Sequence, residues 1–176
     1  MKASIVWMVV GVLAAIVILV VAIGFALPVR HKAVGEARFN QPPAKVFAAI
    51  TDVKSFPSWR PSVKTVEVVA DPEGKQQFRE IGSDGTILFQ VERVVRDKQL
   101  VTRIADRSLP FGGSWTYDLI SDGDATILRI TEDGEVYNPV FRFVSRFVMG
   151  HTSTIDRYLA DLAGHLGEPR TVPGDQ

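Results

Sequence analysis

Charged side chains interrupt the apolar patterns of several predicted strands, and these residues are the best placed to do chemistry. Glu132 shares one face of the run Ala125–Val136 with Leu128 and Ile130, so this acid is expected to point inward. A carboxyl that faces an apolar interior can serve as a general acid or base. The alternative for each such residue is a cross-strand ion pair on the solvated face, which is the expected role of Arg79, Glu92, Arg103 and Arg129.

The histidines could supply a second titratable group. His151 lies in the middle of a predicted helix, on the same apolar stripe as Phe147, and could act as a base or be a hydrogen-bonded core or rim histidine. His31, His151 and His165 show no metal-ligand spacing and the chain has no cysteine, so neither a metal nor another cofactor is expected. The motifs GxGxxG, GxxxxGK[ST] and GxSxG are absent, which removes the usual signals for dinucleotides, nucleoside phosphates and serine hydrolases.

Aromatic side chains could surround an apolar ligand. Trp115 and Tyr117 share one strand face by the period of two, and Phe89 lies on another strand. These rings either line a cavity or fill an ordinary core. Trp59 could form a lip or pin a helical turn, and Tyr137 lies where the last strand meets the last helix. The candidate cavity-lining residues are Trp59, Phe89, Trp115, Tyr117, Glu132, Tyr137, Phe147 and His151.

An uncharged apolar run occupies residues 3–27 and predicts a transmembrane helix, because about 20 apolar residues cross a bilayer. A cleavable signal peptide is the alternative, since Gly24 and Ala26 are spaced like a cleavage site, but the run exceeds the usual apolar core of such peptides. Four basic residues follow the run closely, whereas only Lys2 and the amino group precede it. The positive-inside rule therefore favours a cytoplasmic domain.

The composition of the chain describes one soluble domain behind this segment. Its 176 residues carry 20 Lys and Arg against 20 Asp and Glu, so the net charge of +0 argues against a nucleic-acid partner. We expect a transmembrane helix at 1–27, a linker at 28–32, a folded body at 33–167 and a disordered tail at 168–176.

The periodicity of the body predicts an α+β fold. A strand at 34–40 is followed by a helix at 44–51 and by a proline-rich segment at 52–62 that can hold one helical turn. Six further strands are expected at 63–70, 76–81, 86–95, 99–106, 113–121 and 125–136. One helix of about 28 residues then runs from Pro139 to Leu166. A curved seven-stranded antiparallel sheet wrapped around such a helix is expected to leave a cavity between them.

The passage from the short helices into the second strand carries a family resemblance. Asp52, Phe56-Pro57, Trp59 and Pro61 lead into Val63-x-x-Val66-Glu67, which resembles the START-like superfamily, also called SRPBCC, with its helix-grip fold. Within the superfamily, residues 34–166 look most similar to the bacterial polyketide cyclase/dehydrase and lipid-transport grouping. The resemblance implies a deep pocket for lipids, sterols, aromatic polyketides or other apolar molecules. It does not choose between carriers and enzymes.

Three functions follow as hypotheses. The first is a membrane-anchored START-like protein whose partners are a hydrophobic small molecule or lipid and the bilayer. The second is a polyketide cyclase or dehydratase that uses His151, Glu132 or Tyr137 as acid or base in the same cavity, although the sequence holds no convergent catalytic motif. The third is a protein-interaction module with a filled core. The sequence predicts neither the ligand nor the oligomeric state.

Overall fold

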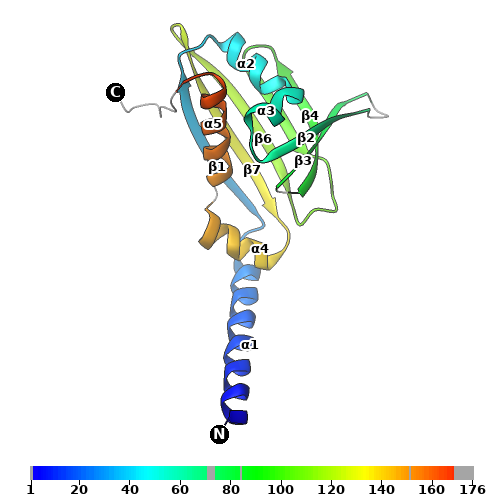
Figure 1. Cartoon of the computed structure of the whole chain (residues 1–176), viewed down its shortest axis with the longest axis vertical. Coiled ribbons are helices and arrows are strands. Elements are labelled where there is room, and N and C mark those ends of the chain that lie inside the picture. Colours follow the sequence, from blue (N-terminus) through cyan, green and yellow to red (C-terminus); the bar gives the residue numbers. More distant parts are fainter. Residues whose placement is uncertain (1, 71–73, 84, 151, 169–176) are drawn as a thin grey trace.

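The computed structural model describes residues 2–70, 74–83, 85–150 and 152–168. A single long helix projects from one end of a body built from a curved sheet and shorter helices (Figure 1). The helical segments are α1 (Lys2–Ala26), α2 (Pro43–Thr51), η1 (Val53–Ser55), α3 (Phe56–Trp59), α4 (Pro139–Val144), η2 (Ser145–Met149) and α5 (Ser153–His165). The strands are β1 (Arg30–Phe39), β2 (Val63–Ala70), β3 (Gln76–Gly82), β4 (Gly85–Val95), β5 (Gln99–Ile104), β6 (Phe111–Asp122) and β7 (Ala125–Val136).

The seven strands form one antiparallel sheet, as the sequence predicts for this α+β fold, and their order is β1-β7-β6-β5-β4-β3-β2. The first strand therefore closes beside the last, with Arg30 opposite Glu135 and Phe39 opposite Thr126. Shifts in register interrupt β2 after Val63 and β4 after Val91. Such bulges increase the local twist and help the sheet to curve.

The sheet begins earlier than the sequence pattern predicts. Residues 30–32, which were expected to belong to a linker, lie in β1 and pair with β7. Their extended structure comes from this pairing and not from an apolar pattern, since Arg30 and Lys32 are exposed and charged. Residues 27–29 alone therefore separate α1 from the sheet.

The core lies where α5 covers the sheet. Ile155, Leu159 and Leu162 of α5 are fully buried, and they belong to one cluster with core residues of β1, β7 and α2. Gly35 of β1 allows the close approach, because a Cβ there would come within 2.5 Å of Ile155 Cγ2. A larger residue at position 35 would push α5 away from the sheet.

The predicted 28-residue C-terminal helix is wrong in one respect, because the structure divides it. α4 continues into the π-helical segment η2, which ends at Gly150, and α5 begins at Ser153. Gly150 has a φ of 75° and a ψ of 149°, a backbone conformation that ends the helix and suits glycine. The apolar period continues across the break, which explains why the pattern reads as one helix.

The two halves of this segment have different neighbours. α5 packs on the sheet and on α3, whereas α4 packs on the end of α1 (Figure 1). Asn138 caps α4, its side chain accepting hydrogen bonds from the amides of Val140 and Phe141. α1 itself is long and apolar enough to cross a membrane, and its most apolar 18-residue stretch is not buried by the body, which covers the helix only near Gly24.

Candidate functional site

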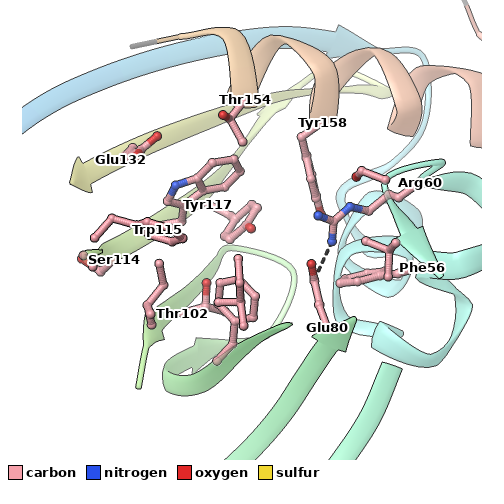
Figure 2. A pocket seen from close by; sticks show the side chains of 18 of the residues that line it. Phe56, Arg60, Glu80, Thr102, Ser114, Trp115, Tyr117, Glu132, Thr154 and Tyr158 are labelled. Carbon is pink, nitrogen blue, oxygen red and sulfur yellow. Dashed lines mark hydrogen bonds and ion pairs between the residues drawn. The ribbon is translucent and has the colours of Figure 1, made fainter. Parts of the chain in front are cut away.

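A cavity of about 560 Å³ lies between the concave face of the sheet and the helices α3 and α5 (Figure 2). Alternate residues of each strand face it, as the period of two requires. On β4 these are Ile87, Phe89 and Val91, and the bulge after Val91 shifts the phase so that Val94 faces it next. The remaining large apolar side chains of its wall include Phe47, Ile50, Phe56, Phe78, Leu100, Ile104, Phe111, Trp115 and Tyr117.

An ion pair interrupts this apolar wall between α3 and β3. The guanidinium of Arg60 donates to a carboxylate oxygen of Glu80 at 2.6 Å, and the two side chains are only 17% and 11% exposed. The Arg60 guanidinium also lies over the rings of Phe56 and Tyr158, 4.9 and 5.1 Å from their centres (Figure 2). Burial disfavours the charge on Arg60, but the neighbouring Glu80 carboxylate outweighs it and raises the pKa of Arg60. The pair is therefore charged and adds no net charge to the cavity.

Two buried tyrosines lie next to this pair. The rings of Tyr117 on β6 and Tyr158 on α5 are 5.7 Å apart, and burial raises the pKa of both phenols. Both side chains are therefore neutral at physiological pH. The Tyr158 hydroxyl has no hydrogen-bond partner of good geometry among the described residues. Because a buried hydroxyl without a partner costs about 1–3 kcal/mol, this group is suited to bind a polar atom of a ligand.

A second polar group lies at the β7 wall. Burial raises the pKa of Glu132 to about 7, although a hydrogen bond from the Trp115 side chain acts in the opposite direction. His31 Nε2 lies 3.5 Å from a Glu132 carboxyl oxygen, and burial lowers the pKa of this imidazole. At neutral pH the imidazole is therefore largely uncharged and the carboxyl about half protonated. A carboxyl in this state can give or take a proton inside an apolar cavity.

Four of the predicted site residues share the cavity. Phe89, Trp115, Tyr117 and Glu132 line it from three neighbouring parts of the sheet, and Figure 2 shows Glu132 beside the indole of Trp115. The inward direction predicted for Glu132 from its strand face agrees with this placement. The ring centres of Trp115 and Tyr117 are 5.9 Å apart, as expected for neighbours on one strand face.

The other predicted lining residues lie elsewhere. Trp59 is buried outside the cavity wall, where it stacks on His165 at 5.3 Å and so pins α3 to α5. Tyr137 is exposed and its hydroxyl donates to Glu135 at 2.7 Å, because the chain turns outward after β7 ends at Val136. Phe147 is 60% exposed, since η2 leaves the sheet. His151 lies outside the described residues.

Three further residues line the cavity although the sequence pattern does not predict it: Arg60, Glu80 and Tyr158. For Glu80 a signal was available: the period of two that places Arg79 opposite Phe78 places Glu80 on the face of Phe78. For Arg60 no local pattern was available, because its position depends on the turn between α3 and β2.

The predicted outer ion pairs are confirmed, with Arg79 bonded to Glu67 at 2.9 Å, Arg103 bonded to Glu92 at 2.6 Å and Arg129 bonded to Glu36. Within the described ranges, no three acidic or histidine side chains gather as metal ligands would.

Comparison with known proteins gives one family. A family model described as "Polyketide cyclase / dehydrase and lipid transport" matches residues 30–167, which is the whole body without α1. No protein of curated function matches the sequence significantly.

Several solved structures share the fold at low sequence identity. A START superfamily protein from Mycobacterium smegmatis is 17% identical, with a TM-score of 0.63 over 78% of this chain and 97% of that one. The Zhui aromatase/cyclase from Streptomyces sp. R1128 is 14% identical, with a TM-score of 0.59 over 78% and 92% of the two chains. An HSP90 activator from Plasmodium falciparum is 19% identical, with a TM-score of 0.58 over 80% and 99%. These likenesses establish the fold, which proteins of different function share.

Proposed function

Because the chain belongs to the polyketide cyclase/dehydrase and lipid transport family, we propose that it binds a hydrophobic small molecule, a lipid or a polyketide-like compound, in the cavity between sheet and α5. The observation that carries the proposal is the cavity itself. Its volume of about 560 Å³ is within the usual range for small-molecule sites, and most of its wall is apolar. The ligand we propose is apolar over most of its surface.

The two polar groups of the wall would orient such a ligand. The Tyr158 hydroxyl lies beside the Arg60–Glu80 ion pair, which carries no net charge. This hydroxyl is therefore suited to bind an uncharged polar group such as a hydroxyl or carbonyl. Glu132 can form a hydrogen bond with a similar group at the β7 wall. It donates when the carboxyl is protonated and accepts when the carboxyl is ionised. A fully charged ligand group would find no unpaired opposite charge at Arg60.

We propose further that α1 anchors the protein in a membrane. Most of its apolar span of 22 residues is exposed, so that burial in a bilayer is the state in which this surface leaves water. A fixed domain meets a ligand that partitions into the same bilayer at a high effective concentration. The anchor therefore complements a hydrophobic ligand.

The first experiment is native mass spectrometry with lipid extraction on the full chain purified from its own source. Ile87→Trp fills the cavity from β4, and Val68→Trp adds the same ring on the exposed face of β2 as a matched control. We expect apolar molecules to copurify with the wild type and with Val68→Trp, and to be lost from Ile87→Trp. Absence of such molecules from the wild type, or equal retention by both folded variants, would contradict the proposal.

Glu132 favours a second candidate function, a cyclase or dehydratase reaction in the same cavity. Its protonation state at neutral pH suits proton transfer to or from a carbonyl compound. Tyr137 faces solvent, so the described residues bring His31 and not Tyr137 to Glu132. Incubation with a linear poly-β-ketone thioester should give cyclised or dehydrated product, lost in Glu132→Gln and retained in Glu92→Gln. Equal turnover by the two variants would rule out this role for Glu132.

The interaction-module hypothesis needs a filled core between the sheet and α5. A cavity of about 560 Å³ at that place argues against it.

A further inference from the structure

Three exposed apolar side chains lie on one short segment of the body. Phe147 and Val148 on η2, at 60% and 72%, are the most exposed large apolar side chains of the described body, and Phe141 on α4 is 51% exposed. We name these three residues the α4–η2 surface. Apolar side chains gathered in this way on a solvent-exposed face usually mark a contact with a partner or a membrane.

Contacts with α1 fix the position of this surface. A Cβ on Gly24 would lie only 2.0 Å from the carbonyl oxygen of Pro139, so the start of α4 touches the backbone of α1. Arg142 donates to the carbonyl oxygen of Leu27 at 2.8 Å, and its guanidinium lies 6.0 Å from the centre of the Phe25 ring. Arg142 thereby satisfies a carbonyl at the C-terminal end of α1. The contacts of Gly24 and Phe25 also argue for a retained α1, since cleavage after Ala26 would remove both residues.

The end of α1 sets the depth at which α4 lies. Twenty-two helical residues from Ile5 to Ala26 extend about 33 Å, close to the ~30 Å hydrocarbon thickness of a bilayer. When the N-terminal part of α1 crosses the bilayer, Phe25 reaches the opposite membrane–water interface. α4, which meets α1 at that end, and η2, which continues α4, then lie at the same interface (Figure 1). Short amphipathic segments at this depth bury their apolar side chains in the headgroup region.

The same segment borders the cavity. Phe141, Ser145 and Gly150 all line it, and Phe141 and Gly150 are also exposed. Residues that face both the cavity and the exterior mark a mouth. Phe111 and Gly112 at the start of β6 line the cavity as well. One mouth of the cavity therefore lies beside α4–η2, at the end of the body that α1 joins.

We propose that the α4–η2 surface lies in the membrane interface and holds the mouth of the cavity against the bilayer, so that the cavity's ligand exchanges with the lipid phase directly. This inference rests on the proposed anchoring and ligand binding, and it names the bilayer as the partner of one surface. An apolar molecule then passes from acyl chains into the cavity along Phe141 without crossing water.

Fluorescence quenching in proteoliposomes tests the proposal. The natural chain has no cysteine, so single cysteines can carry an environment-sensitive fluorophore without other changes. Labels at Phe147→Cys and Val148→Cys test the surface, Val17→Cys in α1 reports insertion, and Val68→Cys on β2 is the exposed control. The full chain is reconstituted in phosphatidylcholine–phosphatidylglycerol vesicles containing a doxyl-labelled phosphatidylcholine as the lipid-phase quencher. Iodide serves as the aqueous quencher.

We expect labels at 17, 147 and 148 to lose most of their fluorescence to the doxyl lipid, and the label at 68 to lose its fluorescence to iodide. Quenching of 147 and 148 by iodide, with 17 still quenched by the doxyl lipid, would overturn the surface proposal and leave the anchor standing. Quenching of position 17 by iodide would overturn the anchor as well.

A matched glycine pair tests the link to α1. Gly24→Leu should separate α4 from α1 and move the label at 148 from lipid-phase to iodide quenching. Gly11→Leu, on the same helix with no atom within 4 Å, should leave the label unchanged. Equal lipid-phase quenching in both variants would show that contact with α1 does not place the α4–η2 surface.

Discussion

The two halves of the C-terminal segment, α4–η2 and α5, share one apolar period but bury it differently. In α5, Ile155, Leu159 and Leu162 are fully enclosed by the sheet and its helices. In the preceding half, Phe147 and Val148 remain exposed although they continue the same pattern. The period therefore specifies that one side of a helix is apolar, whereas the neighbouring element determines what covers it. Four pairs of variants can break or sharpen this contrast between the covered and the uncovered part of the molecule.

The largest effect is expected in the covered part, at the ion pair beneath Tyr158 of α5. Glu80→Gln leaves the buried Arg60 charge without its partner and should lower the free energy of unfolding by about 4 kcal/mol. Glu67→Gln, at the exposed pair with Arg79, should lower it by less than about 1 kcal/mol. Urea titration of the full chain in nanodiscs, followed by far-ultraviolet circular dichroism, measures both. Similar losses in the two variants would mean that the cavity pair is solvated.

The contrast itself is tested by truncating one residue in each half. Leu159→Ala empties part of the enclosed core and should cost about 3 kcal/mol of unfolding free energy. Phe147→Ala should change it by about 0.5 kcal/mol, because the ring has little contact with the body. The same urea titration applies. A cost at Phe147 as large as that at Leu159 would place η2 on the sheet.

A pH-dependent effect is expected at Glu132. The folded protein holds the pKa of this carboxyl at about 7, against 4.5 for the unconstrained side chain. Between these values the folded state binds a proton that the unfolded state has lost, so stability falls as pH rises through this window. Glu132→Gln lacks this loss, so its free energy of unfolding should exceed that of the wild type by about 3 kcal/mol at pH 8, with little difference below pH 4. Thermal unfolding at several pH values measures the difference.

The same comparison contains its own control. His31 is present in both the wild type and Glu132→Gln, so its titration largely cancels in the difference between them. Glu92→Gln, at an outer ion pair, should show no comparable rise between pH 4 and 8. A constant difference between Glu132→Gln and the wild type at all pH values would mean that Glu132 is not buried as described.

The smallest effect is expected at the Tyr158 hydroxyl. Tyr158→Phe removes a buried hydroxyl without a partner and should raise the unfolding free energy of the ligand-free protein by about 1 kcal/mol. Its neighbour Tyr117 is the matched position, because Tyr117→Phe removes a second buried phenol from the same wall. Differential scanning calorimetry separates these small shifts. A loss of stability in Tyr158→Phe would show that its hydroxyl already has a partner.

Much of the body could be predicted from the sequence, because turn residues separate the strands and the period of two assigns their faces. Glu132 was assigned inward on this basis, and the outer ion pairs were anticipated in the same way. The division of the last helix could not be predicted. A lone glycine inside a helical pattern costs only about 1 kcal/mol, so Gly150 is a weak signal.

The packing of α4 on α1 depends on a contact between distant parts of the chain. Arg142 reaches the carbonyl of Leu27 across 115 positions of sequence, and no local pattern encodes this pairing. The placement of Trp59 shows the same difficulty, since its stacking on His165 joins α3 to the far end of α5. Local patterns therefore predict the helices and strands and which of their faces are apolar. They do not predict which element packs on an apolar face when two elements could do so.

The connection between α1 and β1 limits how far the body can travel. Residues 27–29 span at most about 11 Å even when fully extended. Arg142 donates to the Leu27 carbonyl at one end of this connection, and the Val136 amide donates to the Val29 carbonyl at the other. With α1 in a bilayer, the body cannot swing on a tether toward a second membrane. Delivery of a ligand to another membrane would then require an acceptor protein or membrane to approach the cavity, because the body stays at the membrane that holds α1.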